Sequence, residues 1–375
     1  MMATKRLLDV CDFQGGTQPP KDEWINDPRE GYVRMLQIRD YSQGDAKYIQ
    51  YVKDTKKLHK CTKDDIMLSR YGYIGQAFIG LEGAYNVALV KVIKKAEIHT
   101  PYLLCYFQSY YFQHFLLSNV GARATIPGFN KDELEKALIR IPEMCKQIEI
   151  ASKITKVDEL IGFHKQQLNV LDTLIKSRFI EMFGTLSSNE QNFEVLTIES
   201  LCSLIKDGTH QTPTYTEDTI NGFKFLSSKD VMSTKINWGD IKYIPSDLHE
   251  KLYAVVKPIK NDILMSKNGV NYGVAAVNDT DEVFDIYVSL ALLRPKTDII
   301  NPVYFRSAIN SPDTKRQFDS SIKGIGVPNL HLGEIKKTKI LVPPVDKQNE
   351  YVSFVEQVDK SKYHGEFTCE MEVAA

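Results

Sequence analysis

Apolar residues recur at alternating intervals of four and three positions along the chain after Pro142. The stripe runs through Ile150, Ile154, Val157, Ile161, His164, Leu168, Leu171, Ile175, Arg178 and Met182. This spacing is a heptad pattern, which predicts a long helix with one apolar face. Gly184 and the polar run 187–192 end the pattern. We therefore expect one helix from Glu143 to Phe183, whose stripe needs a partner because a lone helix cannot bury it.

The beginning of this helical stretch occurs a second time near the end of the chain. The segment Pro127–Asp158 aligns without a gap with Pro328–Asp359, and identical residues recur throughout it. Upstream, Lys63–Gly72 parallels Lys260–Gly269. A repeat of this length is too long for a solenoid, whose units run to roughly 20–50 residues. The sequence therefore predicts a duplicated domain, so that the molecule does one thing twice.

Between these landmarks, short apolar runs alternate with turn signals, which is typical of β-strands. The expected strands lie at Tyr32–Leu36, Asp65–Ser69, Gln76–Ile79 and Val87–Val92. Pro101 favours a helix start, which predicts a helix over Tyr102–Ser118. The predicted fold class is α/β (α+β), with two duplicated globular domains separated by long coiled-coil spacer helices. The expected boundaries are 1–142 and 186–343 for the globular domains, 143–185 for the central spacer helix and 344–375 for the second.

The second copy of the spacer helix has a shorter apolar stripe than the first. The stripe continues through Tyr351, Val355 and Val358, and then meets Lys362 and Gly365. We therefore expect a truncated helix from Val345 to Lys362, about half as long as the first and antiparallel to it. The first stripe would then be partly uncovered and bind another chain through Ile161, Leu168, Leu171, Ile175 and Met182. The plainer alternative is an ordinary amphipathic surface helix.

Composition and charge are those of an ordinary globular protein. A net charge of −1, with 25% charged and 43% apolar residues, gives no global attraction to nucleic acid. No apolar run approaches the roughly 18 residues of a membrane span, and the first ten residues lack the apolar core of a signal peptide. The six cysteines form no CxxC pair. We expect reduced thiols in the cytoplasm, no metal site, no cofactor and no membrane contact.

The motifs of catalysis are incomplete or missing. Asn301-Pro302-Val303-Tyr304 is similar to the Asn-Pro-Pro-Tyr loop of adenine N6-methyltransferases, but its second proline is absent. Pro302 also aligns with Pro101, so a helix start explains it better. The run Gly324-Ile325-Gly326 lacks the third glycine of a dinucleotide site, and there is no P-loop. The sequence therefore predicts no active site.

Polar turns occur at matched places in both copies. The pairs are 15–18 with 208–211, 69–72 with 266–271, and 121–125 with 321–324. These turns carry glycines that let the backbone approach a partner, cations suited to phosphate, and side chains able to read base edges. The candidate DNA contacts are Thr17, Gln18, Ser69, Arg70, Tyr71 and Arg123 in the first copy, and Thr209, His210, Gln211, Ser266, Lys267, Asn268, Asn271 and Lys323 in the second. Ordinary solvated loops are the alternative, but the recurrence of a cation favours function.

In the order and duplication of these pieces, the chain resembles the specificity subunit of type I restriction–modification systems. The best-matching pieces of the first copy are Leu7–Cys11, Asp65–Arg70, and Ile141-Pro142 followed by Gln147. Those of the second are Ser200–Cys202, Asp262–Ser266, and Val342–Pro344 followed by Gln348. The resemblance implies a non-enzymatic subunit that reads a split site on double-stranded DNA, one half per target-recognition domain.

The resemblance also implies partners. The spacer helices would bind two methyltransferase subunits, and motor-nuclease (restriction) subunits would join outside them. The shortened second helix departs from the family pattern, so the uncovered stripe would take either a methyltransferase subunit or a second copy of this chain. The rival interpretation is a truncated or inactive specificity subunit that serves as a protein–protein scaffold or a recombination reservoir.

Overall fold

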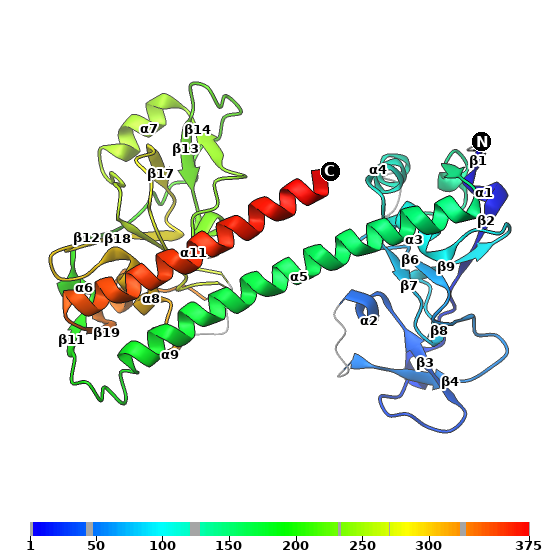
Figure 1. Cartoon of the computed structure of the whole chain (residues 1–375), viewed down its shortest axis with the longest axis horizontal. Helices are drawn as coiled ribbons and strands as arrows, with labels where there is room; N and C mark the ends of the chain where they lie inside the picture. The colour runs from blue at the N-terminus through cyan, green and yellow to red at the C-terminus, as the bar shows by residue number, and fades with distance from the viewer. Residues whose placement is uncertain are drawn as a thin grey trace. The chain divides into compact units, whose positions relative to one another are not determined.

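The computed structural model of the chain describes residues 3–42, 48–120, 128–231, 234–269, 271–322 and 328–374 (Figure 1). It divides into two compact units, Met1–Gly162 and Phe163–Ala375. The boundary falls inside one continuous helix, α5 (Met144–Phe183), which therefore contributes to both units. Each unit combines β-sheets with helices, which confirms the predicted fold class.

Unit 1 is built on three sheets. Its elements before α5 are β1 (Ala3–Arg6), α1 (Leu7–Val10), β2 (Cys11–Gly15), β3 (Tyr32–Leu36), α2 (Ile38–Ser42), β4 (Tyr51–Lys53), β5 (Lys60–Cys61), β6 (Ile66–Ser69), β7 (Ala77–Ile79), β8 (Gly83–Tyr85), β9 (Leu89–Lys94), α3 (Thr100–Gln108), α4 (Tyr110–Asn119) and β10 (Leu138–Ile141). The strand orders are β2-β9-β6-β7, β4-β3-β8-β5 and β1-β10. All strand pairs are antiparallel except β3 with β8.

Unit 2 repeats this plan. Its elements after α5 are β11 (Glu194–Thr197), α6 (Ile198–Leu201), β12 (Cys202–Asp207), β13 (Phe223–Leu226), β14 (Lys242–Ile244), α7 (Ser246–Tyr253), β15 (Ile263–Ser266), β16 (Ala275–Val277), β17 (Phe284–Ile286), β18 (Leu290–Pro295), α8 (Pro302–Ile309), α9 (Pro312–Ser321), α10 (Leu332–Lys337), β19 (Lys339–Val342) and α11 (Val345–Ala374). The strand orders are β12-β18-β15-β16, β14-β13-β17 and β11-β19. The first and last of these match sheets of unit 1 strand for strand, as the internal repeat predicts.

The repeat extends to individual hydrogen bonds. Gln147 is 2% exposed; its amide accepts from the backbone of His99 at 3.0 Å and donates to Pro142 at 2.8 Å. Gln348 is 0% exposed, and it accepts from the backbone of Asn301 at 2.8 Å and donates to Pro343 at 2.8 Å. Each glutamine therefore ties the start of its long helix to the loop before a Pro-initiated helix, which explains why both copies carry it.

The predicted strands and helix starts are largely confirmed. Three of the four expected strands coincide with β3, β6 and β7 to within one residue, and the fourth begins two residues later than expected, as β9. The Pro302 segment begins a helix, because the Asn301 side chain accepts from the backbone of Val303 at 2.9 Å as an N-cap. The single helix expected over 102–118 is wrong. It divides into α3 and α4 at Ser109, whose hydroxyl caps α4 by accepting from the backbone of Phe112.

Helix α5 matches its predicted range, and its last turns belong to the core of unit 2. The rings of Phe179 and Phe183 lie 5.5 and 5.6 Å from that of Tyr351 on α11. Ile175 and Met182 pack against the same core. The prediction that these two residues need another chain is therefore wrong, because α11 and α8 already contact this end of the helix.

Helix α11 runs antiparallel to α5 within unit 2, as expected (Figure 1). It extends to Ala374 rather than ending at Lys362, so the expectation of a half-length helix is also wrong. One glycine, Gly365, costs a helix only about 1 kcal/mol and need not end it. Lys362 itself is 8% exposed and donates to Asp172 on α5 at 2.6 Å and to Asp359 at 3.1 Å. Lys362, at which the apolar stripe was expected to end, therefore forms an ion pair between α11 and α5.

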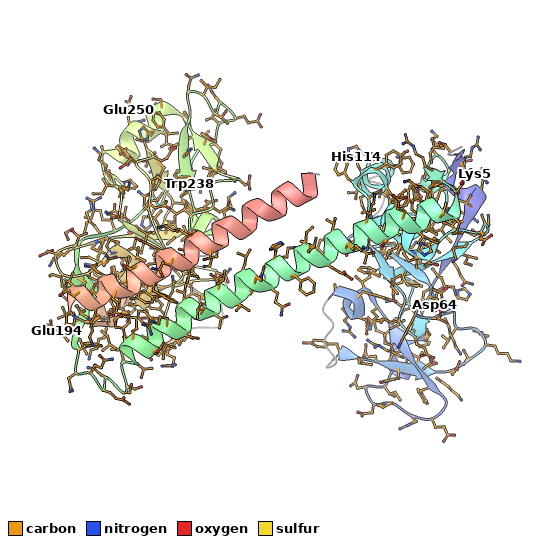
Figure 2. The ribbon with its side chains drawn as sticks, viewed as in Figure 1. Lys5, Asp64, His114, Glu194, Trp238 and Glu250 are labelled. Atoms are coloured by element: carbon orange, nitrogen blue, oxygen red, sulfur yellow. The ribbon has the colours of Figure 1, made fainter. Side chains whose placement is uncertain are left out.

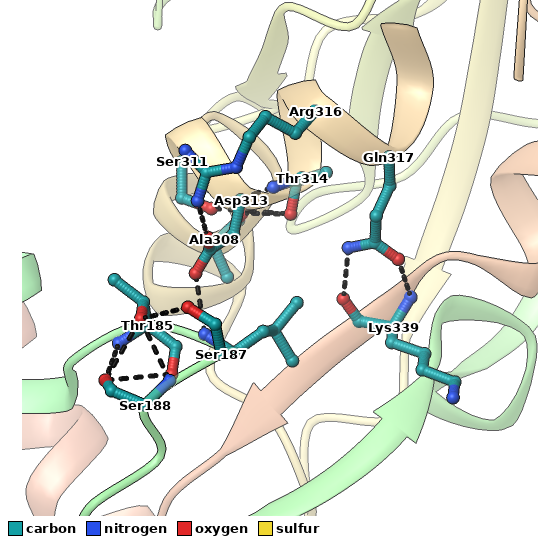
Figure 3. A network of polar contacts seen from close by, with 11 residues as sticks. Thr185, Ser187, Ser188, Ala308, Ser311, Asp313, Thr314, Arg316, Gln317 and Lys339 are labelled. Carbon is teal, nitrogen blue, oxygen red and sulfur yellow. Dashed lines mark hydrogen bonds and ion pairs between the residues drawn. The ribbon is translucent and has the colours of Figure 1, made fainter. Parts of the chain in front are cut away.

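The connection that follows α5 is fastened to α9 by polar contacts (Figure 3). The backbone of Leu186 donates to Asp313 at 2.7 Å, and Asp313 also pairs with Arg316. The amide of Gln317 bonds both ways with the backbone of Lys339 in β19, at 3.0 and 2.9 Å. A second apolar cluster lies beneath β13 and β17, where Trp238 packs edge-on to Phe284 at 5.6 Å (Figure 2). Unit 2 thus has a packed interior on both sides of its central sheet.

Candidate nucleic-acid interface

The turn between β6 and β7 holds the first group of candidate contacts. Ser69 is 0% exposed, and its hydroxyl donates to the backbone of Tyr73 across the turn. Gly72 and Gly75 both have positive φ, at +74° and +79°, which only glycine adopts readily. The buried hydroxyl holds the turn closed and leaves residues 70–73 at the surface side of it. Ser69 therefore stabilises the turn from inside, and its side chain is not exposed for contact with DNA, contrary to the sequence-based expectation.

The turn between β15 and β16 has the same construction. Ser266 is 1% exposed and donates to the backbone of Asn268 at 3.3 Å. Gly269 and Gly273 have φ of +82° and +85°. Like Ser69 in unit 1, Ser266 is therefore not kept among the proposed DNA contacts, because its buried hydroxyl bonds within the turn. Asn271, which follows, is half-buried.

Arg70 lies half-buried at the turn between β6 and β7 and is held by neutral groups. Its Nε donates to the backbone oxygen of Phe129 at 3.0 Å, and a terminal nitrogen donates to the side chain of Asn130. The guanidinium also lies 5.2 Å from the ring centre of Tyr71. These contacts hold the cation in a defined position without neutralising its charge.

Lys267 occupies the corresponding position in unit 2, but its surroundings differ. It is 6% exposed, and its ammonium group lies 2.5 Å from a carboxylate oxygen of Asp207. His210, three residues after this aspartate, places Nε2 3.7 Å from the same carboxylate and is otherwise exposed. Sequence reasoning identified the lysine and the histidine but missed Asp207, which lies at the end of β12.

The Gly-Thr turns lie against the neighbouring sheet in both units. A Cβ atom at Gly16 would overlap the backbone oxygen of Asn86, and one at Gly208 would overlap that of Ile286. The glycines are therefore needed for internal packing, which replaces the expectation that they admit a partner's backbone. The backbones of Thr17 and Thr209 are bonded into these contacts. The candidate side chains that follow them, Gln18, His210 and Gln211, are exposed.

The third pair of turns lies largely outside the described residues, which include neither Arg123 nor Lys323. The chain that follows each of these loops is described. Gly128 forms a backbone bridge with Tyr71, and Asn329 forms the equivalent bridge with Asn268. The end of each loop therefore lies against the hairpin turn of its own unit.

Within the described residues, the first two predicted turns of each unit meet the segment that follows the third turn. In unit 1, Nη1 of Arg70 lies 3.9 Å from where a Cβ of Gly15 would stand, and the guanidinium donates to Phe129 and Asn130, which follow the third loop. In unit 2 the ion pair between Lys267 and Asp207 makes the same connection. Tyr73 is an exposed ring at this surface that sequence reasoning did not select, although its Tyr-Gly-Tyr context was visible.

A cavity of about 430 Å³ adjoins the Gly-Thr turn of unit 2. Its lining includes Asp207, His210 and the buried Asp285. Burial raises the pKa of Asp285, and its hydrogen bond of 2.6 Å to His249 opposes that shift. Among the described residues, no group of three or more His, Cys, Asp or Glu side chains could hold a metal ion. Nor does any described helix have the length and apolar character of a membrane span.

Comparison with known proteins identifies the family. The model for the type I restriction modification DNA specificity domain matches the chain twice, over residues 1–173 and 190–365. The chain is 23% identical over 371 residues to the type I restriction enzyme MjaVIII specificity subunit of Methanocaldococcus jannaschii, covering 94% of this chain and 85% of that protein. It is 22% identical over 376 residues to the EcoBI specificity subunit of Escherichia coli, covering 90% and 75%.

Solved structures share the fold. The S subunit of a type I restriction-modification system from M. genitalium gives a TM-score of 0.52 at 14% identity, covering 100% of this chain and 93% of that one. A chain from a structural study of complex assembly and conformational transition in the type I R-M system gives 0.57 at 15% identity, covering 100% and 94%.

The fold and the matched surfaces define a duplicated recognition protein with one recognition unit per copy. The chain belongs to the type I restriction modification DNA specificity family. Its function is DNA sequence recognition within a restriction–modification complex, and its part in that complex is non-catalytic, as the sequence indicated.

Proposed function

We propose that each unit reads one half of a bipartite DNA site, and that the chain directs methyltransferase subunits, with restriction subunits joining them, to that site. The observation that supports this is that, in both units, two polar turns meet the described segment that follows the third. Duplicated surfaces of this kind suit a target with two halves. The correspondence between the turns extends to backbone bridges, since 71 with 128 corresponds to 268 with 329.

The proposed contacts differ from the first set by the removal of the two buried serines, Ser69 and Ser266, and of Lys267, whose ammonium group pairs with Asp207. In unit 1 they are Thr17, Gln18, Arg70 and Tyr71, with Arg123 kept on sequence grounds. In unit 2 they are Thr209, His210, Gln211, Asn268 and Asn271, with Lys323 kept on the same grounds. Amides and hydroxyls can read base edges, whereas arginine and lysine serve phosphates or guanine.

The proposed docking surface for a methyltransferase subunit is the middle of α5, around residues 161–171. Phe163 and Val170 are 64% and 60% exposed there. Ile161, Leu168 and Leu171, which lie on the heptad stripe of the same helix, are half-buried. Exposed apolar side chains that gather on one segment of a surface helix favour an interaction surface. We propose two methyltransferase subunits per chain, one for each copy of the repeat, with self-association of this chain as the competing use of the stripe.

The experiment that tests the proposed function is methylome sequencing of a host that carries this chain and its methyltransferase. The expected result is a methylated motif in two parts with an unspecified gap. Arg70→Ala should relax or weaken recognition in one half only, by roughly 1–3 kcal/mol if it contacts a base. Lys63→Ala is a matched control, because Lys63 is an exposed cation of the same unit away from the turns. Methylation unchanged by Arg70→Ala would contradict this placement.

The rival function, an inactive scaffold, makes a different prediction. A gel shift with and without co-expressed methyltransferase subunits separates the two. A chain that captures the methyltransferase but retards no DNA, in a host without a bipartite motif, would favour the scaffold.

A further inference from the structure

Two cations at corresponding positions of the repeat have opposite electrostatic surroundings. Arg70 follows β6 and Lys267 follows β15, so each closes the same strand of its own unit. In unit 2, the Asp207 carboxylate lies 2.5 Å from the lysine ammonium, whose side chain is 7% exposed. The Gly-Thr turns align Asp207 with Gly15. Unit 1 therefore has no side chain at the position from which unit 2 neutralises its cation.

The geometry of unit 1 agrees with this correspondence. A Cβ atom at Gly15 would stand 3.9 Å from Nη1 of Arg70, so the guanidinium lies over the position of the missing carboxylate. The hydrogen-bond acceptors of Arg70 are a backbone oxygen and an amide oxygen. Across the described part of the chain, no carboxylate forms an ion pair with it.

We infer that the two units contact the DNA backbone unequally: Arg70 offers its charge to phosphate, whereas Asp207 neutralises Lys267 and withholds that charge. This inference rests on the proposed function, since it assigns roles within the proposed contact surface. It revises the sequence-based expectation that Lys267 serves the second half-site as a free cation.

The physical reason is the cost of separating a buried ion pair. To meet a phosphate, Lys267 would have to leave the Asp207 carboxylate, whose side chain is 22% exposed, with only the exposed His210 beside it. Removing the closest partner of a partly buried charge is destabilising. The carboxylate would also repel the phosphate. The pair as a whole is neutral, so unit 2 recognises DNA mainly through the neutral side chains of Thr209, Gln211 and Asn268. Asp207 is then a specificity determinant, because phosphate contacts favour every sequence equally.

The test uses the salt dependence of binding to a duplex of random sequence, measured by fluorescence anisotropy on the full chain. Each phosphate contact adds about 0.9 to the slope of the logarithm of affinity against that of salt concentration. Arg70→Gln should make the slope shallower by about one contact. Asp207→Asn should make it steeper by about one contact, because it frees Lys267. Asp298→Asn is the matched control: Asp298 is exposed in the same unit, so the charge change is equal and the slope should stay unchanged.

A double variant protects the test against misfolding. Lys267→Met with Asp207→Asn removes the pair without leaving either charge unmatched, so wild-type affinity and slope are expected. A shallower slope for this double variant would show that Lys267 contacts phosphate, which would overturn the inference. A slope for Asp207→Asn equal to that of Asp298→Asn would overturn it as well. Either result is compatible with a bipartite methylation motif, whereas absence of that motif would count against the proposed function itself.

Discussion

Tyr351 is the residue whose removal should most directly separate α11 from α5. It is 0% exposed, and its ring lies 5.5 Å from that of Phe179, 5.6 Å from Phe183 and 6.4 Å from Tyr304. Truncating a buried aromatic side chain costs about 3–5 kcal/mol. Edge-on ring pairs contribute about 0.5–1.5 kcal/mol each beyond their burial. We therefore expect Tyr351→Ala to lower the free energy of unfolding of unit 2 by at least about 3 kcal/mol.

The assay is urea unfolding followed by tryptophan fluorescence. The chain has two tryptophans, Trp24 in unit 1 and Trp238 in unit 2, so a Trp24→Phe background reports unit 2 alone. Tyr351→Phe is the matched control. It keeps the ring and removes only the buried hydroxyl, so the loss should be far smaller than for Tyr351→Ala, below about 1 kcal/mol. A loss below about 1 kcal/mol for Tyr351→Ala would refute the packing of the two helices.

Three further outcomes are expected. Gln348→Ala should cost about 1–3 kcal/mol of unfolding free energy per backbone group left unpaired, whereas Gln357→Ala, at an exposed position of α11, should cost little. Equal losses of stability in urea unfolding would contradict the anchoring role of Gln348. Gly208→Ala should lower the melting temperature, because the new Cβ would overlap the backbone oxygen of Ile286. Gly333→Ala should not, because a Cβ there meets open space, and equal melting temperatures for the two variants would disprove the close packing at Gly208. Burial raises the pKa of Asp285 above its ordinary value, so the folded state binds its proton more tightly and this group's contribution to stability falls as pH rises from the unfolded to the folded pKa. The Asp285→Asn variant cannot ionise at this position and should lack that part of the pH dependence. If the profiles of unfolding free energy against pH of the variant and the wild type were superimposable, this effect would be excluded.

The sequence was sufficient for the features that depend on local period. The heptad spacing predicted α5 to within one residue of its start at Met144, because apolar residues repeat at this spacing over so many turns only when the chain is helical. The repeat predicted that both copies share one plan, and Gln147 and Gln348 show that even buried hydrogen bonds recur. The helix break at Ser109 was missed, since a single capping serine is a weak signal within an aromatic run.

The features that depend on distant residues could not be predicted. Lys362 was expected to end the second stripe because its partner, Asp172, lies far away in the sequence. Ile175 was expected to be uncovered because the core that receives it comes largely from elements after it in the chain. The candidate interface followed the same rule. The first two pairs of predicted turns follow strands of the structure, and the third pair lies largely outside the described residues. The burial of Ser69 and the neutralisation of Lys267 by Asp207 depend on tertiary contacts.

The globular part of each unit begins and ends on one two-stranded sheet. In unit 1, Ala3 pairs with Ile141, shortly before α5 begins. In unit 2, Glu194 pairs with Val342, shortly before α11 begins. A module whose two ends meet can be cut out and replaced without disturbing the strands inside it, since few connections cross its boundary. Natural or engineered exchange of one half of the chain at these sheets would therefore change what one unit reads and leave the helices, and whatever binds them, as they are.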